Sequence, residues 1–524
     1  MIKLILVLLV FIFCSSFLFS QTRVDFWLTL SDNIRLDCTK IIPSGNPPSQ
    51  GWPVVIICHG FGLSKEDVLD YAENLSKYGY YTVAYSMRGQ GNSTGYSNLM
   101  SRTEMSDLMQ VIAFVKSEDL VNPDRIGLVG SSQGGIISLM AACNGAEVAC
   151  VISDLTSPEF ASSWIENGCV KMSLLWSLSY DSSKIRYNER VKDFRRWILS
   201  SKKDKWDSLA YYLPRERDFT DKINEIKVPV LISDSWQDKF FSPLGILKCS
   251  NNFESVHKIY LGAVEGHGSD TTHEENLYHS ELIEKWIEHW LYDMQDSVID
   301  SNQITYAVSC DPVNYSQWSY KRFDSPGWPP EGIEEKRLYF YPENKLISEV
   351  NHSTLDTISF LNDVKDNTIT IQEAINEKFT GDIFASKFQK SYIYLETEPL
   401  ERDYMLLGTP RIYFYYSSNA NICQYNFQIW EVYPDEDMNF ITRANYTDRN
   451  YYPSRIKGKW LYGNSAAHLF KKGDRIRLYV TNIDNGPEDR FLGTNPYVLP
   501  VLKRSKNTIY MGGSKQSFIE LPLK

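Results

Sequence analysis

Residues 125–135 of this chain read Arg-Ile-Gly-Leu-Val-Gly-Ser-Ser-Gln-Gly-Gly, and residues 136–142 continue as Ile-Ile-Ser-Leu-Met-Ala-Ala. The first five residues are typical of a buried strand, and the apolar run after the glycines is typical of a helix packed on a sheet. A serine at the apex of such a strand–turn–helix, with glycine two residues away on each side, forms a nucleophile elbow. Ser132 meets this condition and Ser131 does not. The alternative is an ordinary Gly/Ser loop, because the pattern alone also arises by chance.

The composition indicates a soluble globular protein of two or three domains. The chain has 524 residues, of which 43% are hydrophobic and 23% are charged, and it is too long for one ordinary domain. Its formal net charge is −11. With this charge and without a basic block, the sequence argues against a nucleic-acid partner.

The N-terminus has the pattern of a targeting segment. Lys3 supplies a positive charge, residues 4–13 form a continuous apolar run, and small and aromatic residues follow as far as Ser20. This pattern predicts a secretory signal over residues 1–20, cleaved after Ser20, and a secreted or periplasmic protein. A retained anchor is the alternative. No later segment is long and apolar enough to span a bilayer.

Residues 21–300 alternate between strand and helix patterns. We expect strands at 24–29, 34–40, 54–58, 81–85, 125–129, 150–154, 228–232 and 258–261, and a closing helix over 275–292. Ser64 with Asp67 resembles a capping box that starts a helix. Alternating units of this kind predict a doubly wound, mostly parallel sheet, which is an α/β fold.

Two segments depart from this alternation. Residues 157–224 carry aromatic side chains at roughly helical spacing without a strand signal, and predict a helical cap inserted over the sheet; these side chains include Trp164, Trp176, Tyr180, Trp197, Trp206, Tyr211 and Tyr212. Residues 301–524 contain short β-branched and aromatic segments separated by Asn, Asp, Gly and Pro. This predicts an all-β sandwich or jelly-roll domain that packs directly on the first domain.

A serine nucleophile needs a base, and the base needs an orienting acid. In this fold the chain order is Ser, acid, His. The loop after the strand 228–232 offers Asp238, with Asp234 as the alternative. The base is predicted to be His267, which lies between two glycines in the loop after the strand 258–261. The other histidines considered fit worse, because they lie near or within the final helix, before a strand or in the β region: His257, His273, His279, His289, His352 and His468.

The oxyanion of such a reaction needs two backbone N–H donors. The residue after the nucleophile, Gln133, supplies the first. The loop after the strand 54–58 reads His59-Gly60-Phe61-Gly62, and the N–H of Phe61 is the best candidate for the second. His59 is expected to be a structural hydrogen-bonding residue.

Neither a disulfide framework nor a metal site is predicted. No C-x-x-C occurs among the eight cysteines that follow the signal, and most lie in apolar surroundings, which favours buried thiols; they are Cys38, Cys58, Cys143, Cys150, Cys169, Cys249, Cys310 and Cys423. No His/Cys cluster has metal-ligand spacing, and no cofactor is implied.

With these residues in place, the chain resembles the cocaine esterase / X-prolyl dipeptidyl-peptidase family of α/β-hydrolases. Residues 88–95, Arg-Gly-Gln-Gly-Asn-Ser-Thr-Gly, are similar to the family's R-G-x-G-x-S-x-G segment, although Met87 stands where an aspartate is usual. The resemblance extends to the family's jelly-roll domain through residues 392–400, 407–410, 470–478 and 517–522. Family esterases can use a tyrosine side chain in the oxyanion hole, whereas His-Gly-Phe-Gly here favours backbone donors.

The sequence therefore predicts a serine hydrolase that cleaves an ester or amide, with Ser132 as nucleophile, His267 as base and Asp238 as orienting acid. An acyl esterase similar to cocaine esterase is the first hypothesis. An X-Pro dipeptidyl-peptidase is the alternative, and it requires an acidic residue that binds a free substrate amine. A second alternative is a glycan- or ligand-binding protein with an inactive hydrolase domain. The oligomeric state and the acyl specificity are left open.

Overall fold

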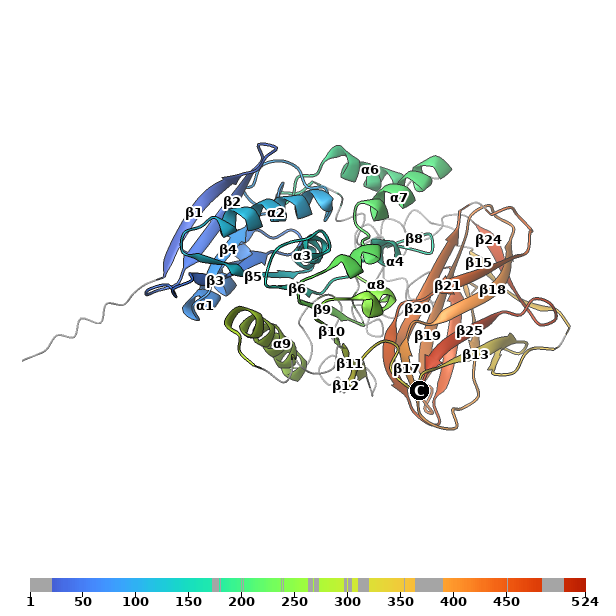
Figure 1. Ribbon diagram of the computed structural model, residues 1–524. Coiled ribbons are helices and arrows are strands. Elements are labelled where there is room, and N and C mark those ends of the chain that lie inside the picture. The colour runs from blue at the N-terminus through green and yellow to red at the C-terminus, as the bar shows by residue number, and fades with distance from the viewer. Residues whose placement is uncertain are drawn as a thin grey trace, which may run out of the picture.

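The computed structural model describes residues 21–171, 179, 181–198, 200, 202–236, 238, 240–262, 267, 273–295, 299, 304–309, 320–352, 354–362, 390–449, 451–482 and 504–524. The predicted signal, Trp176, Tyr180 and Cys310 lie outside these residues. Figure 1 shows two parts side by side, an α/β part drawn in blue to yellow and a β-rich part drawn in yellow to red.

A mostly parallel sheet forms the centre of the α/β part. Its strands pair in the order β1-β2-β4-β3-β5-β6-β9-β10-β11-β12, antiparallel at β1–β2, β2–β4 and β11–β12 and parallel elsewhere. They are β1 (Thr22–Thr29), β2 (Arg35–Ile42), β3 (Trp52–Cys58), β4 (Tyr81–Tyr85), β5 (Val121–Ser131), β6 (Cys150–Asp154), β9 (Val230–Ser235), β10 (His257–Gly262), β11 (Ile304–Ser309) and β12 (Tyr320–Ser325). The order reverses between β3 and β5, and in open α/β sheets ligands bind beyond the carboxyl ends of the strands at such a point.

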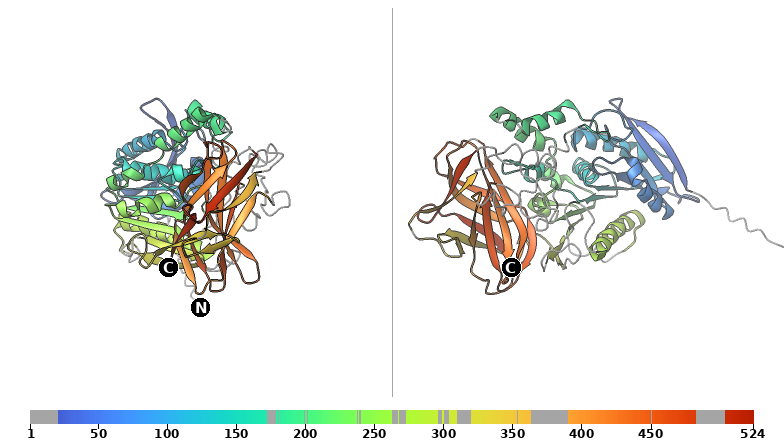
Figure 2. Two further views of the ribbon diagram at one scale, coloured as in Figure 1. Left: turned by 90° about the vertical axis from the view of Figure 1, so that its right-hand side faces the viewer. Right: turned by 180° about the vertical axis from the view of Figure 1, so that it is seen from behind.

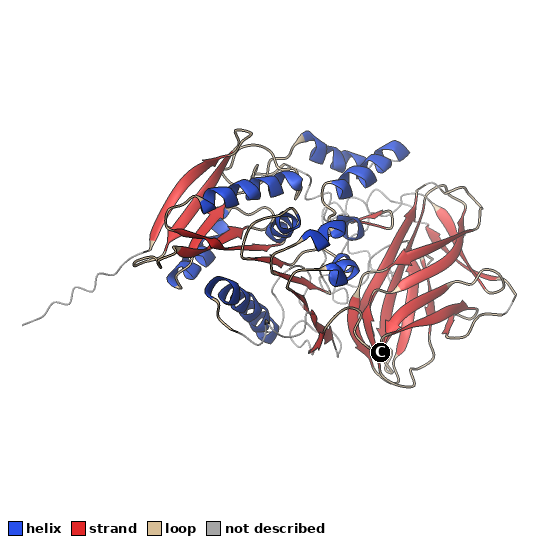
Figure 3. Cartoon of the chain, viewed as in Figure 1, coloured by secondary structure: helices blue, strands red, loops and turns tan. Residues whose placement is uncertain are grey.

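Helices cover both faces of this sheet (Figure 3). One face carries α1 (Leu69–Lys77) and α9 (His273–Tyr292), and the other carries α2 (Arg102–Lys116) and α3 (Gln133–Cys143). Alternate side chains of β3 pack on opposite faces of the sheet. Val55 and Ile57 pack in the cluster that contains α1 and α9, whereas Val54 and Ile56 pack in the cluster that contains α2 and α3. The strand is therefore apolar throughout, as the sequence predicted.

The strands predicted at 81–85 and 150–154 coincide with β4 and β6, and the capping box at Ser64 and Asp67 begins the short helix η1 (Lys65–Val68). The sheet extends further along the chain than the sequence pattern indicated. β11 pairs in parallel with β10, although residues from 301 onward were assigned to the β domain. The reason is burial, because all six residues of β11 are buried between neighbouring strands and helices.

The region 157–224 contains α4 (Phe160–Trp164), α6 (Glu189–Ile198), α7 (Lys203–Arg215) and η2 (Thr220–Glu225). The expectation that it holds no strand is wrong, because β7 (Ile165–Glu166) and β8 (Cys169–Val170) form a hairpin. Glu166 accepts hydrogen bonds from the backbone and side chain of Asn445 at 2.8 and 3.2 Å. Contacts with the β-rich part thus stabilise this hairpin. Its strands have two residues each, which is too short for a strand pattern in the sequence. After β9 the chain forms α8 (Leu244–Cys249) and η3 (Ser250–Asn252).

The β-rich part packs against the cap and the end of the α/β sheet (Figure 2). Its strands are β13 (Glu334–Tyr341), β14 (Lys345–Ile347), β15 (Asp356–Asn362), β16 (Tyr392–Glu396), β17 (Tyr404–Gly408), β18 (Arg411–Ser418), β19 (Cys423–Val432), β20 (Met438–Asp448), β21 (Lys457–Tyr462), β22 (Ala466–Phe470), β23 (Arg475–Thr481), β24 (Ser505–Met511) and β25 (Phe518–Leu523). Most of the pairs are antiparallel, for example β19 with both β20 and β23. The jelly-roll topology and the domain boundaries stay predictions.

The cysteines in the described part of the chain are buried free thiols: Cys38, Cys58, Cys143, Cys150, Cys169, Cys249 and Cys423. Burial raises the pKa of Cys58 to about 11, which keeps this thiol protonated and unreactive at neutral pH. Within the same residues, no helix has the length and apolar character of a membrane span.

Candidate active site

Ser132 lies in a strained turn between β5 and α3. Its backbone has φ +56° and ψ −121°, a region that non-glycine residues rarely adopt and that is found at functional sites. The turn is held because the N–H of Ser132 donates to the carbonyl oxygen of Asp154 at 2.8 Å. This geometry is that of a nucleophile elbow, with Ser132 at its apex.

The structure brings the predicted base and the predicted acid together. Nδ1 of His267 lies 2.6 Å from Oδ2 of Asp238, and the Asp238 side chain is fully buried. Oδ1 of Asp238 accepts the N–H groups of Phe240 and Phe241 at 2.6 and 3.0 Å. Both carboxylate oxygens are therefore engaged, and the carboxylate fixes the proton of His267 on Nδ1, which leaves Nε2 as the acceptor.

Asp234, the alternative acid, has a different environment. It lies on β9, is buried, and accepts the N–H of Ser235 at 2.9 Å. Burial, followed by the nearby charge of Asp238, raises the pKa of Asp234 well above its ordinary value. These conditions favour a neutral carboxylic acid at Asp234 and leave the ion pair with His267 to Asp238.

The loop between β3 and η1 carries Phe61, which lines the same cavity as Ser132. Gln133 is the first residue of α3, so its N–H has no partner within the helix. His59 is a structural residue here, as the sequence suggested. Its Nε2 accepts the N–H of Met87 at 2.9 Å and its Nδ1 donates to the carbonyl of Gly60 at 2.7 Å. Burial lowers the pKa of His59 to about 4.

The segment 88–95 supports this loop. The side-chain amide oxygen of Gln90 accepts the N–H of Gly62 at 3.3 Å, and its nitrogen donates to the Gln133 side chain at 3.2 Å. The Gln133 side chain also donates to Sδ of Met87 at 3.0 Å. Met87, which replaces the usual aspartate, thus connects the segment to the elbow. Sequence reasoning gave Gln133 only a backbone role and missed this bridge.

A cavity of about 780 Å³ joins these elements. Ser132 and His267 line it together with apolar side chains, among them Trp164 of the cap and Phe240 and Phe241 of the loop that follows Asp238. It continues between α9 and the helices η1 and α1, where Asp67 and Glu284 are among the lining residues. None of the described lining residues is a lysine or an arginine.

A second histidine–carboxylate pair lines the same cavity, and sequence reasoning missed it. Nε2 of His279, on α9, lies 2.8 Å from Oδ1 of Asp154. Burial would raise the pKa of Asp154, but His279, Ser233 and Ser131 lower it below the ordinary value. Burial would lower the pKa of His279, but Asp154 raises it. Asp154 thus holds Ser132 through its backbone and His279 through its side chain.

The Asp154–His279 pair predicts a pH-dependent stability. Because the pKa of folded Asp154 is lowered, its contribution is complete above the unfolded value near 3.8 and is lost as the pH falls through the folded pKa. Because the pKa of folded His279 is raised, its contribution is complete below the unfolded value of 6.5 and is lost as the pH rises through the folded pKa. The ion pair therefore stabilises fully between about pH 4 and pH 6.5.

Urea unfolding of the variant His279→Gln tests this expectation. At pH 5.5 the variant should lose about 3 kcal/mol of unfolding free energy relative to the wild type, and at pH 9 clearly less. His352→Gln, at an exposed histidine of the β-rich part, should show no such difference between the two pH values. An equal loss for His279→Gln at both values would contradict a charged pair.

The order of the strands and the elbow at Ser132 define an α/β-hydrolase fold. The family model described as "X-Pro dipeptidyl-peptidase (S15 family)" matches residues 32–267. This match confirms the resemblance to the cocaine esterase / X-prolyl dipeptidyl-peptidase family. The segment from β2 to the His267 loop, which holds Ser132, Asp238 and His267, is the part of the chain that the family model covers.

Some solved structures are similar to nearly the whole chain. A CocE/NonD family hydrolase from Staphylococcus aureus has a TM-score of 0.72 at 14% identity, covering 96% of this chain and 94% of its own. An aminopeptidase from a marine sediment archaeon, Thaumarchaeota archaeon, has a TM-score of 0.73 at 14% identity, covering 96% of this chain and 97% of its own. At this identity the likeness concerns the fold.

Curated relatives match a shorter segment. An uncharacterized 31.7 kDa protein from Escherichia coli is 32% identical over 128 residues, which are 24% of this chain and 43% of that protein. The quorum-quenching protein AidA of Acinetobacter baumannii is 29% identical over 127 residues, 24% of this chain and 42% of its own. The chain thus spans less than half the length of these relatives.

Proposed function

We propose that this protein is a secreted serine hydrolase that cleaves an ester or amide bond through an acyl-enzyme, with an acyl ester as the preferred substrate. One observation carries the proposal. A serine in a strained elbow shares a cavity with a histidine whose Nδ1 is held by a buried carboxylate at 2.6 Å. A histidine fixed in this way presents Nε2 as a base to a neighbouring hydroxyl.

The proposed reaction begins when Oγ of Ser132 attacks the substrate carbonyl while Nε2 of His267 removes its proton. Asp238 stabilises the imidazolium that forms. The N–H groups of Phe61 and Gln133 bind the oxyanion of the tetrahedral intermediate. His267 then protonates the leaving group, and the acyl group stays on Ser132. Water, deprotonated by His267, releases the acid and restores the serine.

A fluorophosphonate probe tests this proposal directly. An activated serine attacks phosphorus and expels fluoride, so the wild type should carry the probe on Ser132 when the labelled protein is digested and its peptides are mapped. Unfolded protein should not react. Folded wild type that takes up no probe would contradict the enzyme and support a binding protein with an inactive hydrolase domain.

An X-Pro dipeptidyl-peptidase is the second candidate, and the cavity gives a reason to test it. Such a peptidase must bind a free substrate amine, and Asp67 and Glu284 supply carboxylates among the cavity-lining residues. Asp67 lies on the helix η1 and Glu284 lies on α9. p-Nitrophenyl butyrate should be turned over faster than Gly-Pro-p-nitroanilide. The reverse preference would favour the peptidase.

A further inference from the structure

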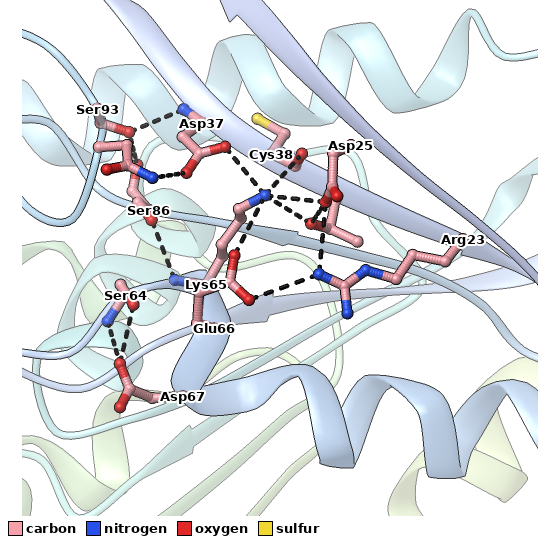
Figure 4. A network of polar contacts seen from close by, with 12 residues as sticks. Arg23, Asp25, Asp37, Cys38, Ser64, Lys65, Glu66, Asp67, Ser86 and Ser93 are labelled. Atoms are coloured by element: carbon pink, nitrogen blue, oxygen red, sulfur yellow. Dashed lines mark hydrogen bonds and ion pairs between the residues drawn. The ribbon is translucent and has the colours of Figure 1, made fainter.

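Lys65 is a buried lysine directly after the loop that carries Phe61. Only 3% of the residue is exposed, and Figure 4 shows its ammonium group surrounded by oxygen atoms. Nζ lies 2.9 Å from carboxylate oxygens of both Asp25 and Asp37. It also lies 2.8 Å from Oγ1 of Thr39, 3.4 Å from the carbonyl of Cys38 and 3.5 Å from Glu66.

These contacts fix the position of the side chain. A buried ammonium group is costly unless it is paired and hydrogen-bonded. Here its partners other than Glu66 come from β1 and β2, which are antiparallel neighbours. Asp37 is held in turn by the side chain of Asn92, whose Nδ2 donates to Oδ2 at 3.1 Å. Lys65 therefore cannot shift without leaving the buried carboxylate of Asp37 without its cation.

The backbone of Lys65 is linked to Asp37 indirectly, through Ser86, which follows β4, and Ser93. Its N–H donates to Oγ of Ser86 at 3.0 Å. The Ser86 carbonyl accepts the hydroxyl of Ser93 at 2.6 Å, and that hydroxyl oxygen accepts the N–H of Asp37 at 2.9 Å. The side chain and the backbone of Lys65 thus converge on Asp37, which lies on β2.

The other attachments of the loop lie at its start and middle. His59 accepts the N–H of Met87, and Gly62 donates to Gln90. Phe61 lies between these two attachments, and Lys65 is the next attachment along the chain. A loop held at three places presents its backbone donors in one geometry, and preorganised donors are what oxyanion stabilisation requires.

We propose that Lys65 is a positioning residue for the oxyanion donor: the contacts of its buried ammonium group with Asp25 and Asp37 hold the loop 59–64 so that the N–H of Phe61 points at the substrate oxyanion. This inference rests on the proposed function. Lys65 acts through the loop and does not touch the substrate. Its loss should therefore weaken transition-state binding more than substrate binding.

The variant Lys65→Met tests the proposal with p-nitrophenyl butyrate as substrate. We expect kcat to fall 10- to 100-fold while KM changes less than threefold. The trifluoromethyl ketone with a butyryl chain forms a tetrahedral adduct whose oxygen occupies the oxyanion site, so its affinity should fall by the same factor. The matching methyl ketone, which forms no stable adduct, should bind as it does to the wild type. An unchanged kcat in Lys65→Met would overturn the proposal.

A double variant separates positioning from stability. Lys65→Met with Asp37→Asn removes both charges, so it should unfold closer to the wild type than Lys65→Met does, and kcat should stay low. Recovery of both stability and kcat would show that Lys65 only stabilises the fold, which would overturn the proposal. This comparison remains available if Lys65→Met alone folds poorly.

Lys40→Met is the matched control. Lys40 lies on β2 and pairs with Glu118, away from the loop, so its kcat should equal that of the wild type. A fall in kcat equal to that of Lys65→Met would overturn the proposal, because the loss of any charge pair of this sheet would then lower kcat. Failure of the proposed function itself looks different, because the wild type would then neither label with fluorophosphonate nor hydrolyse the ester.

Discussion

Asp238→Asn should lower kcat about 10,000-fold with p-nitrophenyl butyrate at neutral pH. Oδ2 of Asp238 lies 2.6 Å from Nδ1 of His267, and Oδ1 accepts two backbone N–H groups. An asparagine held by those N–H groups must keep its oxygen toward them, so its amide NH₂ points at Nδ1. His267 then carries its proton on Nε2, where it cannot accept the proton of Ser132. Ser132→Ala sets the floor for this measurement, about a million-fold below the wild type.

Asp234→Asn is the matched control, because it makes the same substitution four residues away on the same segment. The raised pKa of Asp234 favours a neutral side chain, and asparagine is neutral and of similar shape. We expect kcat within about tenfold of the wild type. A larger loss for Asp234→Asn than for Asp238→Asn would assign the orienting role to Asp234 and contradict the role proposed for Asp238.

Much of this site could be predicted from short stretches of the sequence. Ser132, Asp238 and His267 each follow a strand whose apolar run is visible in the sequence, and glycines flank the serine and the histidine. In a parallel sheet the carboxyl ends of the strands meet at one edge, so residues that follow different strands come together there. This is why the order of three short motifs predicted the contact between Asp238 and His267, although 29 residues separate them.

Other features of the site had no local signal. Lys65 meets Asp25 and Asp37 only because β1 and β2 fold beside η1, and His279 meets Asp154 only because α9 packs on the sheet. A lysine near a helix start and a histidine within a helix are ordinary in sequence. Each becomes unusual through burial, which depends on contacts between distant segments. The β7–β8 hairpin was missed for the same reason.

Gly134→Ala should prevent the elbow from forming. A Cβ on Gly134 would lie 2.0 Å from the carbonyl oxygen of Cys58 and 2.6 Å from its carbonyl carbon. Both atoms belong to the backbone of β3, which pairs with β4 on one side and β5 on the other, so they have no room to retreat. The substitution must push α3 away from β3, at an expected cost of at least about 3 kcal/mol in unfolding free energy.

The same displacement should slow catalysis about 100-fold in any protein that still folds. Gln133 begins α3 and Ser132 precedes it, so a shift of α3 moves both the nucleophile and an oxyanion donor, and a misplacement of about 1 Å costs about 100-fold in rate. Thermal unfolding and fluorophosphonate labelling measure the two effects separately. Gly327→Ala is the control, because the nearest atom to its Cβ would be a side-chain oxygen of Asn251 at 3.4 Å. If Gly134→Ala kept the stability and labelling rate of Gly327→Ala, α3 and β3 could not be in contact at the elbow, and the strained geometry of Ser132 would need another cause.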